Sequence, residues 1–282
     1  MNRGRMLAWA ENGHKLMFEG PLLVRQLHLP VTDNWISTKN WIGTNTHGPI
    51  RGIWMRYRVL ASDYDGTLAD DGKVDGRTAQ ALRQLRASGR QLILVTGREL
   101  IDLQQTFSDL SLFEYVVTEN GATLYRPATK VEEALAPPPP DAFVALLRER
   151  GVTPLSVGRT IVATVQPNEH IVLQTIRDLG LELQVIFNKG AVMVLPSAVN
   201  KGTGLTTALE RMMIPPSEVV AIGDGENDHS LLSTAGLGIA VSNAVPLLQE
   251  AAAFVTEQPA SRGVVEVIDR LLAKESTFEL AK

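Results

Sequence analysis

Short apolar runs alternate with helix-like segments along most of the chain, and this alternation limits the possible folds more than any other feature. Each run suits one buried strand and ends in a polar or glycine-containing turn, whereas the intervening segments carry apolar residues at helical spacing. The pattern predicts an α/β fold with a Rossmann-like parallel sheet covered by helices on both faces. The expected strands are 57–63, 91–96, 115–118, 219–224, 238–241 and 254–256, and the expected helices are 77–88, 99–108, 201–213, 227–235, 244–252 and 263–273.

The alternation is interrupted around a stiff run of prolines, Pro137 to Pro140. The sequence that follows reads as a helix and two strands, repeated once, which predicts an inserted α+β (αββαββ) cap domain. We expect the cap at 131–196 and the core domain at 55–130 and 197–282. In the cap, the expected helices are 141–150 and 168–179, and the expected strands are 154–157, 160–165, 181–187 and 191–195. An insertion joined by two linkers can move as a lid.

Residues 1–54 differ from the rest of the chain. They contain all four tryptophans and scattered turn-forming residues, and no helical or alternating period persists. Three interpretations remain open: a loosely ordered extension, a small segment that binds a partner, or a leader that is not part of the natural product. We assign this segment no function.

Composition excludes several classes of function. The chain has no cysteine, so disulfides, zinc–thiolate sites and thiol nucleophiles are excluded. The net charge of -4 indicates no nucleic-acid partner. No apolar leader opens the chain, and no apolar run reaches the length of about 18 residues that spans a membrane. We therefore expect a cytoplasmic protein with no membrane partner, and the oligomeric state stays open.

Two carboxylates, Asp63 and Asp65, follow the first expected strand. Alternate residues of an extended chain point the same way, so both side chains are expected on one side of the strand end. Two like charges this close raise each other's pKa unless a cation lies between them. The alternative is a simple turn rich in Asp and Gly. A calcium loop of the EF-hand type fits badly, because Leu68 and Val74 stand where its Gly and Glu belong.

Further polar clusters occur at strand ends or helix starts, which border the ligand crevice of a parallel sheet. They are Thr96-Gly97-Arg98, Lys201, and Asp224-Gly225-Glu226-Asn227-Asp228. Each has a simpler interpretation: Thr96 as a helix cap, Lys201 as a solvated residue, and the last cluster as a calcium-like loop. Lys201 stands before two glycines, whereas a nucleotide-binding phosphate loop places its Lys after the glycines. A nucleotide-binding loop at Lys201 is therefore not expected.

Together these clusters supply the groups that phosphoryl transfer from a monoester requires. Mg²⁺ neutralises the phosphate dianion, and Asp63, Asp224 and the Asp65 carbonyl are suitable oxygen ligands. A carboxylate can act as nucleophile, and a second one can protonate the leaving alkoxide and later deprotonate water. The Thr96 hydroxyl, the Gly97 amide and a lysine can hold the phosphoryl oxygens.

These motifs resemble those of the haloacid dehalogenase (HAD) superfamily phosphatases, in the right order from about Arg56 to Ala273. Asn120, in Glu119-Asn120-Gly121-Ala122, is similar to a turn that borders the site in the Cof-like branch. The resemblance implies a role for each of these residues. Asp63 is the nucleophile and Asp65 the acid/base, with Lys201 as a third catalytic residue; Thr96, Gly97, Arg98, Asn120, Lys201 and Asn227 bind phosphate; Asp63, Asp65, Asp224 and Asp228 hold or orient Mg²⁺.

The sequence therefore predicts a Mg²⁺-dependent phosphatase that acts on a small phosphate ester, either a sugar phosphate or phosphoglycolate. One alternative is a phosphotransferase or phosphomutase of the same fold. Another is a non-catalytic metabolite sensor, or a module that acts through the Trp-rich segment on a protein partner. The cap is expected to select the substrate, and Arg159 and the Asn188-Lys189-Gly190 turn are candidates.

Overall fold

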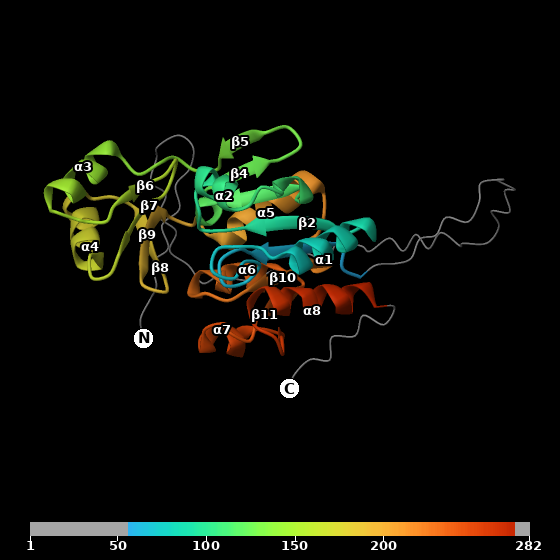
Figure 1. Ribbon diagram of the computed structural model, residues 1–282. Coiled ribbons are helices and arrows are strands. Elements are labelled where there is room, and N and C mark those ends of the chain that lie inside the picture. Colours follow the sequence, from blue (N-terminus) through green and yellow to red (C-terminus); the bar gives the residue numbers. More distant parts are fainter. Residues whose placement is uncertain (1–55, 274–282) are drawn as a thin grey trace, which may run out of the picture. The chain divides into compact units, whose positions relative to one another are not determined.

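The computed structural model describes residues 56–273, and the predicted α/β fold is confirmed (Figure 1). An eight-stranded sheet has the order β12-β11-β10-β1-β2-β3-β4-β5. Its strands are β1 (Val59–Asp63), β2 (Gln91–Val95), β3 (Tyr115–Thr118), β4 (Thr123–Arg126), β5 (Val131–Ala134), β10 (Val219–Gly223), β11 (Leu237–Ala240) and β12 (Phe254–Val255). The expected segment 1–54 lies outside the described residues.

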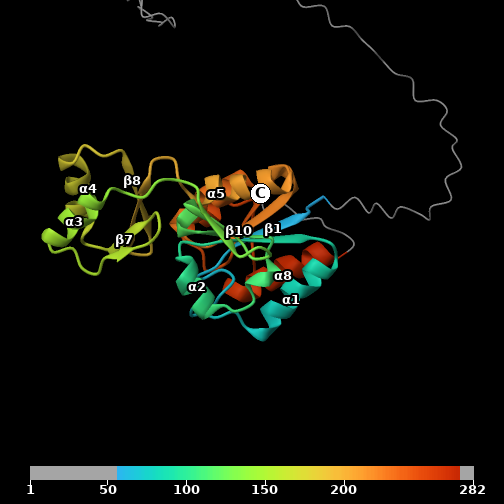
Figure 2. The same ribbon diagram turned by 90° about the horizontal axis from the view of Figure 1, so that it is seen from above.

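The central strand β1 is parallel to both of its neighbours, with Val59 level with Val219 of β10 and with Gln91 of β2. Every residue of β1 is buried, as its continuous apolar sequence predicts for a strand covered on both faces. The core helices are α1 (Gly76–Ala87), α2 (Leu100–Thr106), α5 (Lys201–Met212), α6 (His229–Thr234), α7 (Pro246–Ala251) and α8 (Ala260–Leu272). Figure 2 shows α1 and α8 on one face of the sheet and α5 on the other. The carboxyl ends of the parallel strands therefore meet at one edge of the sheet.

Strands β4 and β5 form an antiparallel hairpin that extends the sheet beyond β3 and that the sequence pattern does not predict. The sequence predicts residues 131–134 in the cap, but β5 pairs with β4 and so belongs to the core sheet. The error has a physical reason: β5 is a solvent-facing edge strand of sequence Val-Glu-Glu-Ala. Charged residues suit an exposed edge strand but hide the apolar pattern by which strands are identified.

The inserted domain contains a separate antiparallel sheet of order β6-β7-β9-β8, in agreement with the predicted αββ repeat. Its elements are α3 (Asp141–Glu149), β6 (Ser156–Val157), β7 (Val162–Val165), α4 (Glu169–Asp178), β8 (Leu183–Asn188) and β9 (Ala191–Pro196). Phe143 and Leu147 of α3 and Val172 of α4 pack on Val162 and Val194 of the sheet, so both helices cover one face. The opposite face is left for contact with the core domain.

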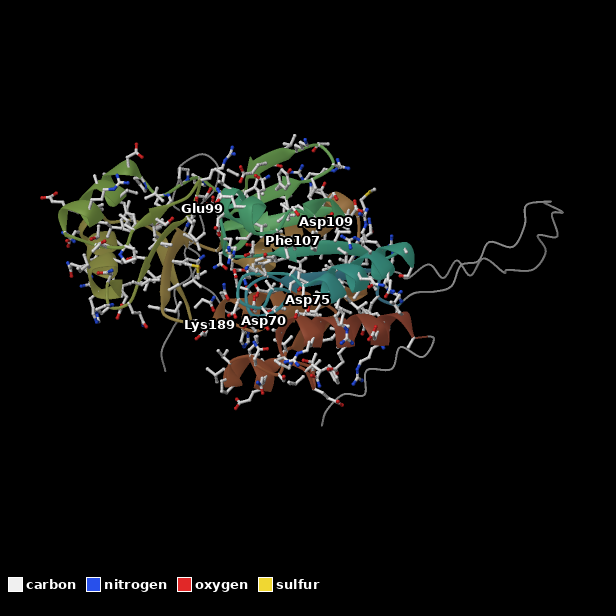
Figure 3. All side chains as sticks on the ribbon, in the orientation of Figure 1. Asp70, Asp75, Glu99, Phe107, Asp109 and Lys189 are labelled. Atoms are coloured by element: carbon white, nitrogen blue, oxygen red, sulfur yellow. The ribbon has the colours of Figure 1, made fainter. Side chains whose placement is uncertain are left out.

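Local capping explains where helices begin. Asp75, labelled in Figure 3, accepts a hydrogen bond of 2.6 Å from the amide of Thr78 and so begins α1. Asn200 forms a reciprocal capping box with Thr203, which makes Lys201 the first residue of α5. The helix expected at 227–235 is divided into a 3₁₀ turn, η4 (Glu226–Asp228), and α6.

The described part of the chain contains three further 3₁₀ turns: η1 (Leu110–Leu112), η2 (Glu119–Gly121) and η3 (Pro216–Glu218). Helix α8 begins at Ala260, before the expected residue 263. Within residues 56–273, no helix combines the length and apolarity that crossing a membrane requires.

Candidate active site

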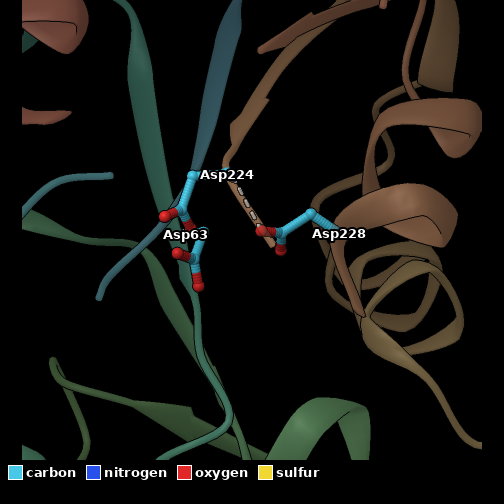
Figure 4. A group of neighbouring side chains, drawn as sticks. All are labelled: Asp63, Asp224 and Asp228. Atoms are coloured by element: carbon cyan, nitrogen blue, oxygen red, sulfur yellow. Dashed lines mark hydrogen bonds between the residues drawn. The ribbon is translucent and has the colours of Figure 1, made fainter. Parts of the chain in front are cut away.

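Three predicted carboxylates come together at the carboxyl ends of β1 and β10. Asp63 is the last residue of β1, Asp224 follows β10, and Asp228 closes the next turn. One oxygen from each lies within 4.8 Å of the others, and all three residues are buried. Figure 4 shows the three side chains gathered around one point. The structure thus brings together residues that are far apart in the sequence.

The amine of Lys201 lies between two of these carboxylates. It donates hydrogen bonds of 2.6 Å to Oδ1 of Asp63 and 2.6 Å to Oδ1 of Asp228. Burial alone would lower the pKa of Lys201, but the carboxylates of Asp228 and Asp63 outweigh burial and raise it above its usual value. Lys201 therefore remains cationic in the site. The interpretation of Lys201 as a solvated surface residue is wrong, because only 1% of the residue is exposed.

The remaining carboxylate charge in this cluster is poorly compensated. Burial, and then the charge of Asp228, raise the pKa of Asp63, and Lys201 only partly opposes them. Burial also raises the pKa of Asp224, against the effect of Lys189. A divalent cation would relieve this repulsion, and carboxylate oxygens are the ligands that Mg²⁺ prefers. The donor set and its charge therefore fit a magnesium ion.

Asp228 also organises the backbone of the site. Its Oδ2 accepts hydrogen bonds of 2.9 Å from the amides of Asp224 and Gly225, and the first of these is the dashed line in Figure 4. A side chain at Gly223 would approach Asp228 within 2.6 Å, so glycine permits this turn. Because Asp228 already binds Lys201 and two backbone amides, it is suited to orient Lys201 and Asp224 and less suited to bind a metal ion directly.

Asp65 points to a different partner from the three clustered carboxylates. Its two oxygens accept hydrogen bonds of 2.7 and 2.8 Å from Nε and Nη2 of Arg98. Arg98 also donates to Asp102 at 2.8 Å, and Asp65 raises the pKa of Arg98 further above its ordinary value. The Asp65 side chain is 47% exposed, so water and ligands can reach it. Its predicted contact with the metal, through the backbone carbonyl, stays a prediction.

The predicted phosphate-binding residues Thr96, Asn120 and Asn227 are buried. The hydroxyl of Thr96 accepts a 3.1 Å hydrogen bond from the Arg98 amide. The side-chain amide of Asn227 donates to that of Asn120 at 2.9 Å. This contact leaves Asn227 Oδ1 and Asn120 Nδ2 buried without a hydrogen-bond partner in the described part of the chain. Such orphaned polar atoms are costly, and a bound ligand can satisfy them.

A cavity of about 520 Å³ lies above these residues, between the core and the inserted domain. The core residues that line it include Asp63, Asp65, Gly97, Arg98, Lys201 and Asn227, and the inserted domain supplies Ser156, Ile161, Ala163, Asn188, Ala191 and Met193. Of the cap candidates, Asn188 lines the cavity. Arg159 instead donates to Glu132 of β5 at 3.2 Å.

Several further side chains contact Asp224 and its neighbouring loop, and of these only Lys189 is among the candidates expected from sequence. Lys189, labelled in Figure 3, donates to the carboxylate of Asp224 from the turn between β8 and β9. The hydroxyl of Thr67 donates to Asp224 at 3.3 Å. Asn243 donates to the Gly66 carbonyl at 2.9 Å. Thr67 stands in the Asp-Gly-Thr motif, which offered a signal, whereas nothing in the sequence around Asn243 separates it from an ordinary turn residue.

Known proteins resemble this chain in sequence and in fold. The sequence profile of the haloacid dehalogenase-like hydrolases matches residues 60–157 and 174–268. A phosphoglycolate phosphatase of Methanothermobacter thermautotrophicus is 30% identical over 76% of this chain and 99% of its own length. One of Methanopyrus kandleri is 32% identical over 76% and 97%. The solved structure of a HAD subclass IIB sugar phosphatase has a TM-score of 0.64 at 20% identity, covering 75% of this chain and 98% of the other.

Proposed function

Because the chain belongs to the haloacid dehalogenase-like hydrolase family and is a phosphatase, we propose that it hydrolyses a small phosphate monoester through an aspartyl-phosphate on Asp63. The observation that carries this proposal is the buried cluster of Asp63, Asp224, Asp228 and Lys201 at the floor of the cavity. Carboxylates alone would repel a phosphate dianion. The lysine and a cation held by the carboxylates make the site suitable for one.

Asp63 is the carboxylate best placed to act as nucleophile. It lies at the end of the central strand and lines the cavity, and Lys201 fixes one of its oxygens. Its other oxygen would attack the phosphorus, and the alkoxide would leave on the opposite side. Lys201 stays bound to Asp63 and Asp228, so its charge faces the phosphoryl oxygens without a rearrangement of the site.

Asp65 is the residue proposed to move the proton. It would protonate the departing alkoxide and then take a proton from the water that hydrolyses the aspartyl-phosphate. Arg98 holds both of its oxygens in this structure, so Asp65 would release at least one of these hydrogen bonds to take up the proton that it transfers at the cavity. Thr96, Gly97, Asn120 and Asn227 would bind the phosphoryl oxygens by hydrogen bonds.

Mg²⁺ is the cofactor that we propose for the site, with Asp63, Asp224 and the Asp65 carbonyl as ligands and Asp228 as orienting residue. When bound, it would neutralise the phosphate and the carboxylates together. Asp224 is itself positioned from three directions, by the hydroxyl of Thr67, the amine of Lys189 and, at 3.5 Å, the amide of Asn243.

The inserted domain gives the cavity a largely apolar wall, which favours a substrate with few hydroxyl groups. This wall is part of the cap sheet. Ala163 of β7 pairs with Ser156 of β6 and with Met193 of β9, and Ala191 of β9 pairs with Asn188 of β8. Only Ser156 and Asn188 among these cap residues offer a polar side chain. A hexose has several hydroxyls that lose hydrogen bonds to water when buried, and this surface would leave most of them unpaired. Phosphoglycolate has none, and its carboxylate could accept hydrogen bonds from the N–H donors of Arg98 that remain beyond those bound to Asp65 and Asp102.

The test is phosphate release from phosphoglycolate, glucose 6-phosphate and p-nitrophenyl phosphate, measured with Mg²⁺ and with EDTA. Asp63→Asn keeps the shape of the side chain but removes the nucleophile's charge, so turnover should disappear while the fold survives. Asp71→Asn is the matched control, because Asp71 is an exposed carboxylate of the same loop. We expect the control to keep wild-type turnover, and phosphoglycolate to give the highest kcat/KM.

Two outcomes would contradict the proposal. Equal turnover by Asp63→Asn and the wild type would exclude Asp63 as nucleophile. If folded wild-type protein transfers phosphate to an added sugar faster than to water, product analysis would show it, and the enzyme would be a phosphotransferase.

A further inference from the structure

A core carboxylate binds a turn of the inserted domain at the rim of the cavity. The turn between β6 and β7 presents three backbone amides to Glu119, which belongs to the core turn η2. Oε1 accepts from the amide of Arg159 at 2.8 Å, and Oε2 accepts from Thr160 at 2.6 Å and Ile161 at 2.9 Å. Hydrogen bonds from amides to an ionised carboxylate are stronger than those between neutral groups. One side chain of the core thus holds three consecutive residues of the cap.

The contact is buried and closely fitted. Glu119 is 2% exposed, and its backbone has a φ of 49°, in the left-handed region that disfavours residues other than glycine. Such a backbone persists where surrounding contacts hold it in place. On the cap side, a Cβ at Gly158 would lie 3.0 Å from the carboxylate and 2.8 Å from a methyl of Ile161. The absence of a side chain at Gly158 therefore allows the turn to reach Glu119.

The ion pairs that the described residues form between the two domains are more exposed. Lys189, which binds Asp224, has 46% of its side chain exposed, and Arg159, which binds Glu132, has 51% exposed. Exposed ion pairs are screened by water and salt and contribute little. Glu119 therefore provides the firmest polar attachment of the β6–β7 turn to the core.

The same contact joins the cap to the phosphate site. Glu119 directly precedes Asn120, whose side chain binds that of Asn227. Ile161, the third amide donor, lines the cavity. Any shift of the turn relative to Glu119 would therefore move an apolar wall of the cavity against the residues proposed to bind phosphate.

We propose that Glu119 is a positioning residue that anchors the β6–β7 turn of the inserted domain to the core, and so sets the position of the cap over the reacting phosphate. This inference rests on the proposed function for its kinetic part only. Glu119 does not line the cavity, so its effect on catalysis passes through Asn120 and Ile161.

The experiment uses the absence of cysteine from the chain, which allows two introduced thiols to be spin-labelled without background. Leu173→Cys places one label on exposed helix α4 of the cap, and Gln80→Cys places the other on exposed α1 of the core. Pulsed electron paramagnetic resonance then measures the distance between the domains without substrate. Glu119→Gln keeps the size of the side chain but replaces one acceptor oxygen with a donor group.

In Glu119→Gln we expect the single narrow distance distribution of the parent to broaden. With phosphoglycolate, KM should rise about tenfold or more, with a smaller change in kcat. A misplacement of this kind can lower the rate of an enzyme by up to about a hundredfold. Glu132→Gln is the matched control: it removes the ion-pair partner of exposed Arg159 on the same turn and should leave both the distribution and KM at parental values.

Gly158→Ala tests the same contact from the cap side, and it serves if Glu119→Gln fails to fold. It should broaden the distribution because the added methyl separates the turn from the carboxylate. The inference is overturned if a folded variant of either kind keeps the parental distance distribution. The distance is measured without turnover. A broadened distribution in the variant would therefore support the anchor even if the parent protein proved inactive on phosphate esters, a result that would contradict the proposed function.

Discussion

The amine of Lys189, on the inserted domain, is hydrogen-bonded to Oδ2 of Asp224, on the core, although the two residues are distant in the sequence. Asp224 is also one of the three carboxylates that form the candidate metal site. The cap therefore places a positive charge on a proposed magnesium ligand. A lysine and a divalent cation compete for the same carboxylate, because both are attracted to the same oxygens.

We predict that Lys189→Met strengthens Mg²⁺ binding. Lys189 is about half exposed, so its pairing with Asp224 is worth at most about 1 kcal/mol, which corresponds to a Kd about two- to fivefold lower without it. Isothermal titration calorimetry with Mg²⁺ measures this directly. Lys73→Met, which removes an exposed lysine of the core loop, should leave the Kd unchanged. Weaker Mg²⁺ binding in Lys189→Met would show that Lys189 supports the site rather than competing for it.

The metal-free protein should lose stability as the pH rises. Burial, followed by the charge of Asp228, raises the pKa of Asp63 to about 8, whereas an unfolded aspartate titrates at about 3.9. Between these values the folded chain holds a proton that the unfolded chain has released. The free energy of unfolding therefore falls as the pH increases through this window. Thermal unfolding in EDTA between about pH 5 and pH 8 measures the slope.

Asp63→Asn is the control for this slope, because asparagine does not titrate. Its Tm should fall less steeply with pH than that of the wild type, and equal slopes would exclude Asp63 as the cause. Mg²⁺ should raise the wild-type Tm more at pH 8 than at pH 5.5, since protons and the cation compete for the same carboxylate.

Asn243→Ala should weaken both the fold and the site. Asn243 donates to the Gly66 carbonyl at 2.9 Å, and its oxygen accepts from the Ala260 amide at 2.6 Å. Loss of these hydrogen bonds should lower the free energy of unfolding by about 1–2 kcal/mol and reduce kcat, because Gly66 follows Asp65. Chemical denaturation and steady-state kinetics measure the two effects. The neighbouring change Ser242→Ala should alter neither, and a fully active Asn243→Ala would contradict a role in positioning the loop.

Gly204→Ala should destabilise the core. Helix α5 packs so closely on the turn at Gly121 that a Cβ at Gly204 would lie 2.5 Å from Val117 and 2.7 Å from the Gly121 Cα. Overpacking of this kind costs about 1–3 kcal/mol. Gly76→Ala in α1 is the matched control, because its Cβ would meet nothing within 4 Å. The control should be neutral or stabilise by up to about 1 kcal/mol. Equal denaturation midpoints for the two variants would contradict the packing argument.

The sequence predicted those features that depend on local pattern. Continuous apolar runs identified the central strands, such as Val59–Asp63, and the αββ repeat identified the inserted domain. Edge strand β5 was missed because its two glutamates suit an exposed position and obscure the apolar alternation. The glycines after Lys201 lie inside helix α5, where they are points of close helix packing.

The candidate site followed from the sequence only in part. Strand-end motifs indicated which residues to expect near Asp63, because parallel strands end at the same edge of a sheet. Contacts between distant segments left no such signal. The positions of Lys189 on Asp224 and of Glu119 on the β6–β7 turn depend on how the cap packs on the core. Arg159, expected to contact substrate, is held by Glu132 for the same reason.

The position of β1 in the middle of the sheet has a consequence for the order of events during synthesis on the ribosome. Val59 of β1 pairs with Val219 of β10, so the first strand of residues 56–273 to emerge must wait for about 160 further residues before this neighbour exists. The inserted domain draws all of its strands and helices from residues 141–196, so its strands can pair with one another before β10 is synthesised. The carboxylate cluster therefore forms late in synthesis, beneath a cap whose own segments are already complete.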